Sequence, residues 1–169
     1  MAGRLIQTKH DDLTYRIVGC AMAVHNKLGP GLREDSYQRA LEVLLAERAL
    51  SFEPQKLIPV TAGEQNGAVV GYYIPDFVVD GAVVVEIKAL DGFDNAHLAQ
   101  VIGYLTVTSC QVGLLINFGQ RRLEWRRILP PRDVSTRVIN RRWLFVPDWL
   151  RGEAPCHDAD STDAEQGAA

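Results

Sequence analysis

The sequence has few cysteines and no long apolar run among its 169 residues. Cys20, Cys110 and Cys156 lack metal-site spacing and cannot all pair within one chain, which favours a reducing, cytoplasmic location without structural zinc. No apolar stretch is long enough to span a membrane, and Met1–Lys9 lacks the apolar core of a signal peptide, so we expect no membrane partner. A Walker-type phosphate loop and a Gly-x-Ser-x-Gly nucleophile elbow are also absent from the sequence. These absences argue against membrane proteins, Walker-type nucleotide hydrolases and hydrolases with a serine elbow.

Charge is unevenly distributed along the chain, although the net charge is only −3. Residues 151–169 hold one arginine against five acids, and we expect this acidic tail to be disordered. Segment Arg121–Arg142 holds eight arginines against two acids. A basic segment of this density can attract phosphate backbones, but a solvated protein surface explains it equally well. The candidates within it for binding nucleic acid are Arg121, Arg122, Arg126 and Arg127.

The stretch Ile74–Lys88 combines apolar residues with three charged candidates for a functional site. Two apolar runs are joined by a turn around Gly81. The first run contains Asp76, and the second ends in Glu86-Ile87-Lys88, in a chain with four lysines and fourteen arginines. Side chains alternate along a strand, so Glu86 and Lys88 point to the same face. Charges inside such a buried strand are costly unless they are paired or bound to a metal ion.

The register of this hairpin decides whether the two acids meet. A three-residue loop at 80–82 places Asp76 opposite Glu86, whereas a two-residue loop at 80–81 places it opposite Val85, on the wrong face. The dipeptide Asp-Gly by itself favours the two-residue turn. We predict the three-residue loop. Two facing carboxylates repel each other, and the usual relief is a divalent cation such as magnesium, which prefers oxygen ligands.

Helix and strand patterns alternate over residues 11–129, which predicts one α/β domain. The predicted helices are Asp11–Leu28, Leu32–Ala49 and Ala96–Thr108, the last capped by Asn95. The predicted strands are Leu57–Ala62, Val69–Val79, Val83–Ala89, Val112–Phe118 and Leu123–Leu129. Residues 1–10 are an N-terminal arm. Segment 130–150 is too apolar for a free linker, so we expect it to dock on the domain or to form a self-association surface.

Several polar residues on the predicted helices are further candidates. Glu34 precedes Tyr37 by three residues, but an acid in a first helical turn needs no functional explanation. Gln100 and Tyr104 share one helix face, and such a polar row is usually exposed. Because this helix directly follows the Glu-x-Lys strand, the row could instead flank the carboxylates. His25, near the end of the first helix, is better explained as a capping or packing residue than as a catalyst.

The element order helix, three strands, helix, strand, with Asp76 and Glu86-x-Lys88, resembles the PD-(D/E)xK nuclease superfamily. Further blocks resemble the GxxExxY protein family, whose name corresponds here to Gly31, Glu34 and Tyr37. The resemblance covers roughly residues 12–128, and its ordered blocks are more specific than the short charged motif alone. They are His25-Asn26-x-Leu28-Gly29-Pro30-Gly31-Leu32-x-Glu34-x-x-Tyr37, Ile58-Pro59-Val60, Asp76-Phe77, Glu86-Ile87-Lys88, Gln100-x-x-x-Tyr104 and Gly113-Leu114-Leu115-Ile116-Asn117-Phe118.

The resemblance implies a restriction-endonuclease-like αβββαβ core of the α/β class, with a central mixed sheet flanked by helices. It implies a metal-dependent nuclease acting on nucleic acid, with DNA favoured over RNA. The ligands of Mg²⁺ or Mn²⁺ would be Asp76, Glu86 and Glu34. Lys88 would position and help activate the attacking water. Gln100 and Tyr104 would support the active site and the nucleic acid.

Two other functions stay open at this point, because a fold by itself does not decide function. The first is a non-catalytic module that binds nucleic acid through the basic segment Arg121–Arg142. The second is a homo-oligomeric assembly protein in which Trp143 and Trp149 are buried between chains. Binding without cleavage would favour the first, and a large particle without binding would favour the second.

Overall fold

Strand β5 (Val83–Lys88) lies in the middle of a five-stranded sheet, as its apolar run predicts. The computed structural model describes residues 10–62, 67–131, 139 and 141–151. The strand order is β1-β4-β5-β6-β7. The other four strands are β1 (Phe52–Pro54), β4 (Phe77–Val79), β6 (Val112–Asn117) and β7 (Glu124–Ile128). Only the β5–β6 pair is parallel, so the sheet is mixed.

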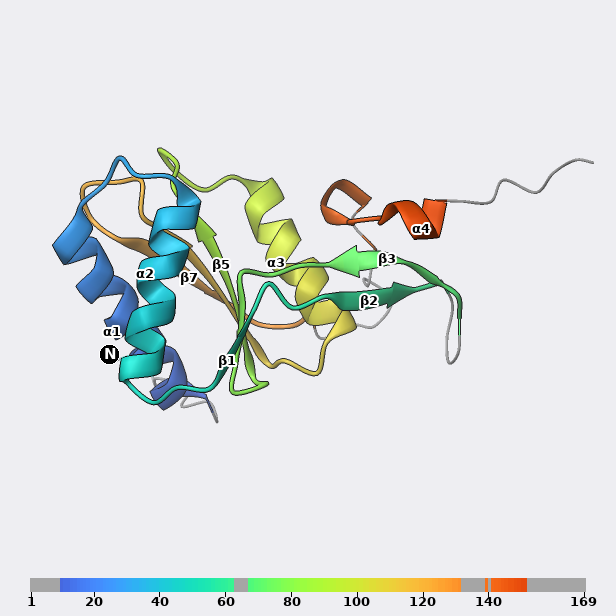
Figure 1. Ribbon diagram of the computed structural model, residues 1–169, viewed down its shortest axis with the longest axis horizontal. Helices are drawn as coiled ribbons and strands as arrows, with labels where there is room; N and C mark the ends of the chain where they lie inside the picture. Colours follow the sequence, from blue (N-terminus) through green and yellow to red (C-terminus); the bar gives the residue numbers. More distant parts are fainter. Residues whose placement is uncertain (1–9, 63–66, 132–138, 140, 152–169) are drawn as a thin grey trace, which may run out of the picture.

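Helices cover both faces of this sheet (Figure 1). Helices α1 (Asp11–Leu28) and α2 (Glu34–Glu47) pack on one face, and α3 (Asn95–Val107) packs on the other. Helix α3 connects the parallel strands β5 and β6, a connection that antiparallel neighbours do not need. The predicted α/β architecture with a central mixed sheet flanked by helices is confirmed.

The two faces of β5 differ in chemistry, although all six of its residues are buried. Val83, Val85 and Ile87 face α1 and α2 within a wholly apolar core. On the α3 face Val84 joins a second apolar core, and Glu86 and Lys88 follow it on the same side of the strand. The polar side chains of the candidate site therefore lie between the sheet and α3.

The hairpin between β4 and β5 has the predicted register. Val79 pairs with Val83 and Phe77 with Val85, so Asp76 stands just before the ladder at the level of Glu86. Asp80 and Gly81 both have positive φ angles, 50° and 64°, and the Ala82 N–H donates to the Val79 carbonyl at 3.0 Å. The Asp-Gly dipeptide thus makes its favoured tight turn, and Ala82 supplies the third loop residue.

The predicted strand Val69–Val79 is wrong as a single strand. It divides into β3 (Val69–Tyr73) and β4, which belong to different sheets. The break at Ile74–Asp76 contains Pro75, which has no N–H to donate to a ladder. Strand β3 pairs instead with β2 (Ile58–Thr61) in a separate two-stranded ribbon. Sequence analysis missed the three-residue strand β1, which pairs with β4.

The helix ends differ slightly from the predicted ones. Asp94, rather than Asn95, caps α3: its Oδ1 accepts from the His97 N–H at 2.9 Å, and His97 Nδ1 accepts from the Asp94 N–H at 3.1 Å. Histidine here takes the role that glutamate or glutamine has in the usual capping box. Helix α2 begins at Glu34, so Leu32 lies outside it.

The C-terminal segment packs on the two-stranded ribbon. Its elements are a 3-10 helix, η2 (Arg141–Trp143), and the short helix α4 (Asp148–Arg151). Tyr72 of β3 and Phe145 exchange two backbone hydrogen bonds of 2.8 Å, and the Tyr72 and Trp149 rings lie 6.0 Å apart. Self-association of this segment stays a prediction. Residues 1–9 of the predicted arm (1–10) and residues 152–169 of the predicted tail (151–169) lie outside the described residues.

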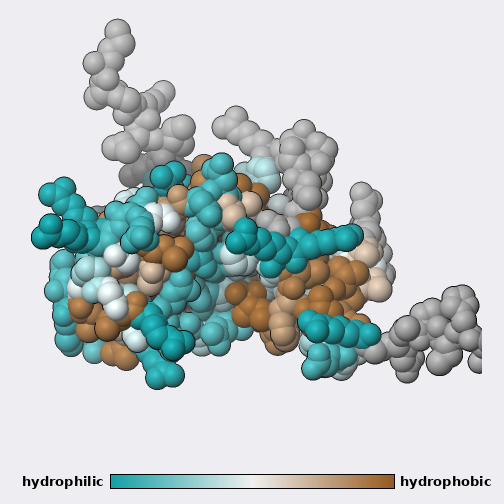
Figure 2. Space-filling view, turned by 90° about the horizontal axis from the view of Figure 1, so that it is seen from above, coloured by the Kyte–Doolittle hydropathy of each residue, from teal (hydrophilic) through white to brown (hydrophobic). Residues whose placement is uncertain are grey.

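Hydrophobic side chains gather on the end of the molecule that carries the ribbon and the C-terminal segment (Figure 2). Phe145 and Trp149 contribute to the exposed apolar surface, with exposed fractions of 48% and 68%. In the part of the chain that the structure describes, no helix has the length and apolar character needed to cross a membrane.

Candidate active site

A buried ion pair between Glu86 and Lys88 forms the centre of the site. Both side chains project from β5 toward α3, and the residues are only 4% and 7% exposed. Lys88 Nζ donates to Glu86 Oε1 at 2.7 Å. Burying two charges is costly even when they attract each other, so hydrophobic residues would serve stability better in this strand. The pair is therefore better explained by chemistry than by folding.

Asp76 brings a second carboxylate to the same place. The break between β3 and β4 places it beside β5, where its Oδ2 accepts from the Ile87 N–H at 2.6 Å. This hydrogen bond fixes one oxygen of the carboxylate against the strand that carries Glu86 and Lys88. The irregular backbone around Pro75 is thus what positions the second acid.

Helix α3 contributes two buried polar side chains that contact Glu86. Gln100 Nε2 donates to Glu86 Oε1 and to the Tyr104 hydroxyl, both at 2.7 Å. The exposed fractions of Gln100 and Tyr104 are 5% and 1%. Burial and the negative charge of Glu86 raise the pKa of Tyr104, which keeps its hydroxyl protonated. The polar row on α3 therefore faces the carboxylates, which was the less usual of the two interpretations of the sequence.

Glu34 lies at the edge of this cluster. Its Oε1 accepts from the Ala89 N–H at 3.3 Å, directly after the end of β5, and the residue is exposed. Tyr37 explains how the preceding loop is held, since its hydroxyl donates to the Gly29 carbonyl at 2.6 Å and accepts from the Leu32 N–H at 3.1 Å. The Tyr37 ring stacks on Phe118, with 4.6 Å between centroids.

Burial makes both central carboxylates hard to ionise. The pKa of Glu86 rises from 4.5 to about 7, first because of burial and then because of the charge of Asp76, while Lys88 opposes the rise. The pKa of Asp76 rises from 3.8 to about 6, again mainly through burial, against the lowering effects of the Ile87 N–H and Lys88. Two acids raised together in this way are typical of sites that bind a cation or move a proton.

The residues fit a divalent cation that prefers oxygen ligands. Glu86 Oε2 is buried and has no hydrogen-bond partner among the described residues, and Asp76 has one oxygen outside its bond to Ile87. Magnesium is commonly held by one or two carboxylates, with waters and substrate oxygens as its other ligands. Over 10–62, 67–131, 139 and 141–151, no three His, Cys, Asp or Glu side chains are grouped to hold an ion, so Glu34 does not complete a three-residue ligand set here.

Comparison with known proteins identifies the family. The model of the PD-(D/E)XK nuclease superfamily matches residues 11–128. The chain belongs to the PD-(D/E)XK nuclease superfamily. The matched range holds both carboxylates, Lys88, Gln100, Tyr104 and Glu34. Asp76 and Glu86-x-Lys88 lie within the matched range, and their assignment as the acid and the E-x-K of the superfamily's name stays a prediction. The finer resemblance to the GxxExxY family stays a prediction.

No curated protein matches the chain. A solved structure titled "Crystal structure of SSO0001" is similar at 24% sequence identity and a TM-score of 0.47. The similarity covers 60% of this chain and 52% of that one, so the chain spans about half the length of that protein. The assignment to the nuclease superfamily therefore rests on the family match and on the residues of the site.

The four arginines predicted to bind nucleic acid do not share one surface. Arg121 and Arg122 are exposed in the turn between β6 and β7. Arg126 lies on the α3 side of the sheet, with its guanidinium 5.8 Å from the Phe93 ring centroid. Arg127 points to the opposite face, because side chains alternate along β7, and pairs with Asp11.

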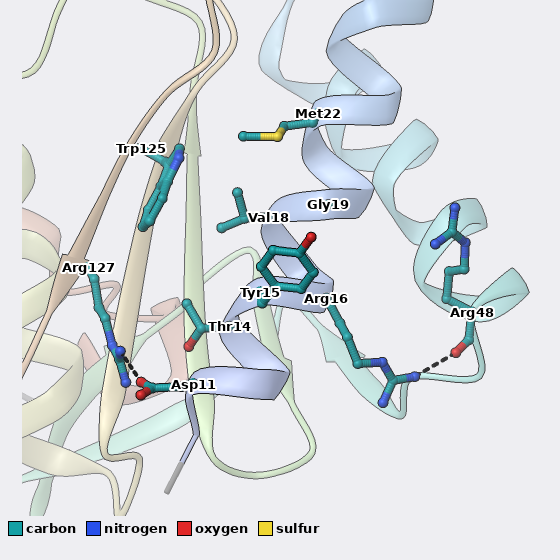
Figure 3. Close-up of a pocket in the computed structure, with 10 residues that line it drawn as sticks. All are labelled: Asp11, Thr14, Tyr15, Arg16, Val18, Gly19, Met22, Arg48, Trp125 and Arg127. Atoms are coloured by element: carbon teal, nitrogen blue, oxygen red, sulfur yellow. Dashed lines mark hydrogen bonds and ion pairs between the residues drawn. The ribbon is translucent and has the colours of Figure 1, made fainter. Parts of the chain in front are cut away.

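Binding of nucleic acid by these arginines stays a prediction, and Arg127 lies on the face of the sheet opposite Glu86 and Lys88. A hollow between α1 and β7 lies on this opposite face, with Tyr15 and Met22 from the helix and Trp125 from the strand (Figure 3). Figure 3 also shows Arg127 joined to Asp11 at the base of α1. The sheet separates this hollow from Glu86 and Lys88, so the hollow is not part of the carboxylate site.

Sequence analysis missed two residues beside the site. Asn117, fully buried in β6 next to Lys88, accepts from the Leu90 and Gly119 N–H groups at 2.9 and 3.0 Å and donates to the Leu90 carbonyl at 2.9 Å. Asn117 is the polar residue in the otherwise apolar run 112–118, and this exception in the sequence could have indicated its role. The second residue is Trp143, which the sequence suggested only for self-association. Its ring centroid lies 5.6 Å from Lys88 Nζ.

His25 has a packing role. Its Nε2 lies 2.8 Å from the Gln120 carbonyl, and its ring is near Phe118 at 6.2 Å between centroids. This placement agrees with the interpretation of His25 as a capping or packing residue, and the Gly29 N–H also donates to its carbonyl at 2.8 Å.

Proposed function

We propose that this protein is a metal-dependent phosphodiester hydrolase that cleaves nucleic acid, with DNA favoured over RNA. The observation that carries the proposal is the Glu86 carboxylate, which is buried between Lys88 and Gln100 and keeps one oxygen without a partner among the described residues. An unpartnered buried carboxylate oxygen costs stability, which favours a functional reason for keeping Glu86 in this strand. Membership of the nuclease superfamily supplies the matching chemistry.

Asp76 and Glu86 would hold Mg²⁺ or Mn²⁺, and Glu34, whose charge contributes to the raised pKa of Asp76, would add to the negative charge that attracts the ion. A divalent cation at such a site polarises the phosphoryl group and lowers the pKa of a bound water. Side chains of the protein hold the carboxylates in position. Gln100 holds Glu86 Oε1 in place, and Tyr104, which stays protonated, fixes the orientation of the Gln100 amide.

Lys88 is best suited to an electrostatic and orienting role. Its ammonium is held by Glu86 at 2.7 Å on one side, and the Trp143 ring lies on another. An ammonium held in this way beside two carboxylates can orient an attacking water and stabilise the negative charge that develops on the phosphate. Because the group is buried, its interaction with that charge is screened less than it would be in water.

The geometry also supports the finer assignment to the GxxExxY family. Tyr37 bonds to both ends of the loop 29–32, and this loop leads directly into the first turn of α2. The spacing between the glycine, the glutamate and the tyrosine therefore has a physical purpose: the tyrosine fixes the loop that brings Glu34 to the end of β5.

Cleavage assays test the proposal. The purified protein is incubated with end-labelled single- and double-stranded DNA and RNA, each with Mg²⁺, Mn²⁺ or EDTA. We expect cleavage that requires the metal ion and that falls about a hundredfold or more in Lys88→Ala, the scale on which losing one charge-stabilising donor acts. Lys56→Ala is the matched control, because Lys56 is exposed and pairs with Glu53 on the surface.

Two results would redirect the interpretation. Binding to nucleic acid that weakens steeply with salt, without cleavage of any substrate, would favour the non-catalytic binding module. Equal cleavage by the wild type and Lys88→Ala would contradict the assigned site even if the protein is a nuclease.

A further inference from the structure

The C-terminal segment brings an aromatic side chain to the candidate active site from outside the family-matched residues. The match ends at residue 128, and Trp143 lies in η2, beyond it. The Trp143 ring centroid is 5.6 Å from Lys88 Nζ, a distance at which an ammonium is attracted to the face of an indole. The family pattern does not include this residue, so any role for it comes from this chain's own structure.

The position of Trp143 is fixed by its neighbours in the segment. Two residues later, Phe145 makes both backbone hydrogen bonds to Tyr72 at 2.8 Å. Leu144 packs so closely on β3 that a Cβ at Gly71 would stand 2.6 Å from Leu144 Cγ. The glycine is therefore required for this approach, and the segment is held as an extra strand-like edge of the ribbon. Trp143 is not a loose side chain on the surface.

Three buried polar atoms in this region have no hydrogen-bond partner among the described residues. They are Glu86 Oε2 and Gln100 Oε1, which are acceptors, and Trp143 Nε1, which is a donor. Buried polar groups in folded proteins are nearly always paired, so unpaired groups gathered around one ion pair point to something that binds there. The two acceptors suit a cation and its waters. The single donor suits an anion beside them.

We propose that the indole N–H of Trp143 donates a hydrogen bond to a phosphate oxygen of the nucleic acid, while its ring face holds the Lys88 ammonium. This inference rests on the proposed function, because it needs a phosphodiester at the carboxylate site. It adds a substrate-contacting residue that the family motif does not contain. The C-terminal segment then forms one wall of the site.

Trp143→Phe separates the two roles of the side chain, since phenylalanine keeps a ring face against Lys88 but has no N–H. Trp149→Phe is the matched control: it removes an indole N–H from the same segment, at a residue that is 68% exposed and contacts Tyr72 rather than Lys88. Binding is measured by fluorescence anisotropy with fluorescein-labelled single- and double-stranded DNA, with Ca²⁺ at the carboxylates and again in EDTA, so that the readout is binding rather than cleavage and the proposed cation site is filled in one condition.

We expect Trp143→Phe to bind DNA about 10- to 100-fold more weakly than wild type, the range of a lost hydrogen bond to a charged group. The slope of log affinity against log salt should not change, because no charge is removed. The melting temperature should stay equal or rise, since the variant removes a buried donor that has no partner in the free protein. Trp149→Phe should bind like wild type.

Several outcomes would overturn the inference. Unchanged binding in Trp143→Phe would show that the N–H does not contact the phosphate. A lower melting temperature with unchanged affinity would assign Trp143 a structural role only. The proposed function is tested separately. Weaker binding by Trp143→Phe, without cleavage by any form of the protein, would support the phosphate contact and reject the nuclease. Metal-dependent cleavage by the wild type, with binding unchanged in Trp143→Phe, would support the nuclease and reject the phosphate contact.

Discussion

Glu86→Gln should stabilise the metal-free protein at neutral pH, although it removes a partner of a buried lysine. The pKa of Glu86 rises from 4.5 in the unfolded chain to about 7 in the folded protein. Each unit is worth about 1.4 kcal/mol, so ionising this group costs the folded state roughly 3 kcal/mol above pH 7. This cost already includes the attraction of Lys88. Glutamine keeps the shape of the side chain and avoids the cost.

The sign of the pH dependence follows from the same shift. Between pH 4.5 and about 7 the folded state binds more protons at Glu86 than the unfolded state does, so stability falls as the pH rises through this window. Asp76, raised to about 6, acts in the same direction and is coupled to Glu86, so the two shifts do not simply add. We therefore expect the wild type to lose stability from pH 5 to pH 8, and the variant to lose distinctly less.

Urea denaturation followed by circular dichroism measures this prediction, in EDTA at pH 5 and at pH 8. Glu86→Gln should exceed the wild type by about 3 kcal/mol at pH 8 and by only about 1 kcal/mol at pH 5. Glu53→Gln is the control, because Glu53 is exposed and pairs with Lys56 at the surface. A Glu86→Gln variant less stable than wild type at pH 8 would refute the reasoning, since it would mean that the charge of Glu86 stabilises the fold.

Three further predictions concern residues around the site. Tyr37→Phe should lower the free energy of unfolding by about 1–3 kcal/mol, because two partly buried hydrogen bonds, to the Gly29 carbonyl and the Leu32 N–H, are lost, and urea denaturation measures the loss. Gly71→Ala should displace the C-terminal segment, because the added Cβ would clash with Leu144. Faster limited proteolysis after η2 would show this displacement, and unchanged proteolysis would mean that Leu144 moves aside without cost. Asp11→Ala should leave cleavage at the wild-type rate, because its partner Arg127 faces away from Glu86, and a slower rate would return Arg127 to the site.

The centre of the site could be predicted from the sequence because strand geometry is simple. Alternation put Glu86 and Lys88 on one face, and the loop length put Asp76 at the level of Glu86; the structure has both features. The helical spacing of Gln100 and Tyr104 was equally visible, but only the tertiary structure shows that they face inward. Periodicity gives the relative direction of side chains within one element and leaves their direction toward other elements open.

The errors have physical causes that no local pattern reveals. The apolar run at 69–79 was predicted as one strand, because a strand that passes from one sheet to another keeps the same apolar composition on both sides of the break. The three-residue strand β1 is too short to produce a periodic signal. Charge density alone also could not show the pairing of Arg127 with Asp11, which is 116 residues away in sequence. The contact of Trp143 with Lys88 is likewise a product of long-range docking.

The most direct test of the account compares cleavage of DNA by the wild type, Glu86→Gln and Glu53→Gln, each with Mg²⁺ and with EDTA. The account predicts that the wild type and Glu53→Gln cleave DNA in Mg²⁺, that neither does so in EDTA, and that Glu86→Gln is inactive in both conditions while remaining folded. Full cleavage by the folded Glu86→Gln variant would contradict it, because the buried carboxylate at the centre of the site would then have no part in the chemistry.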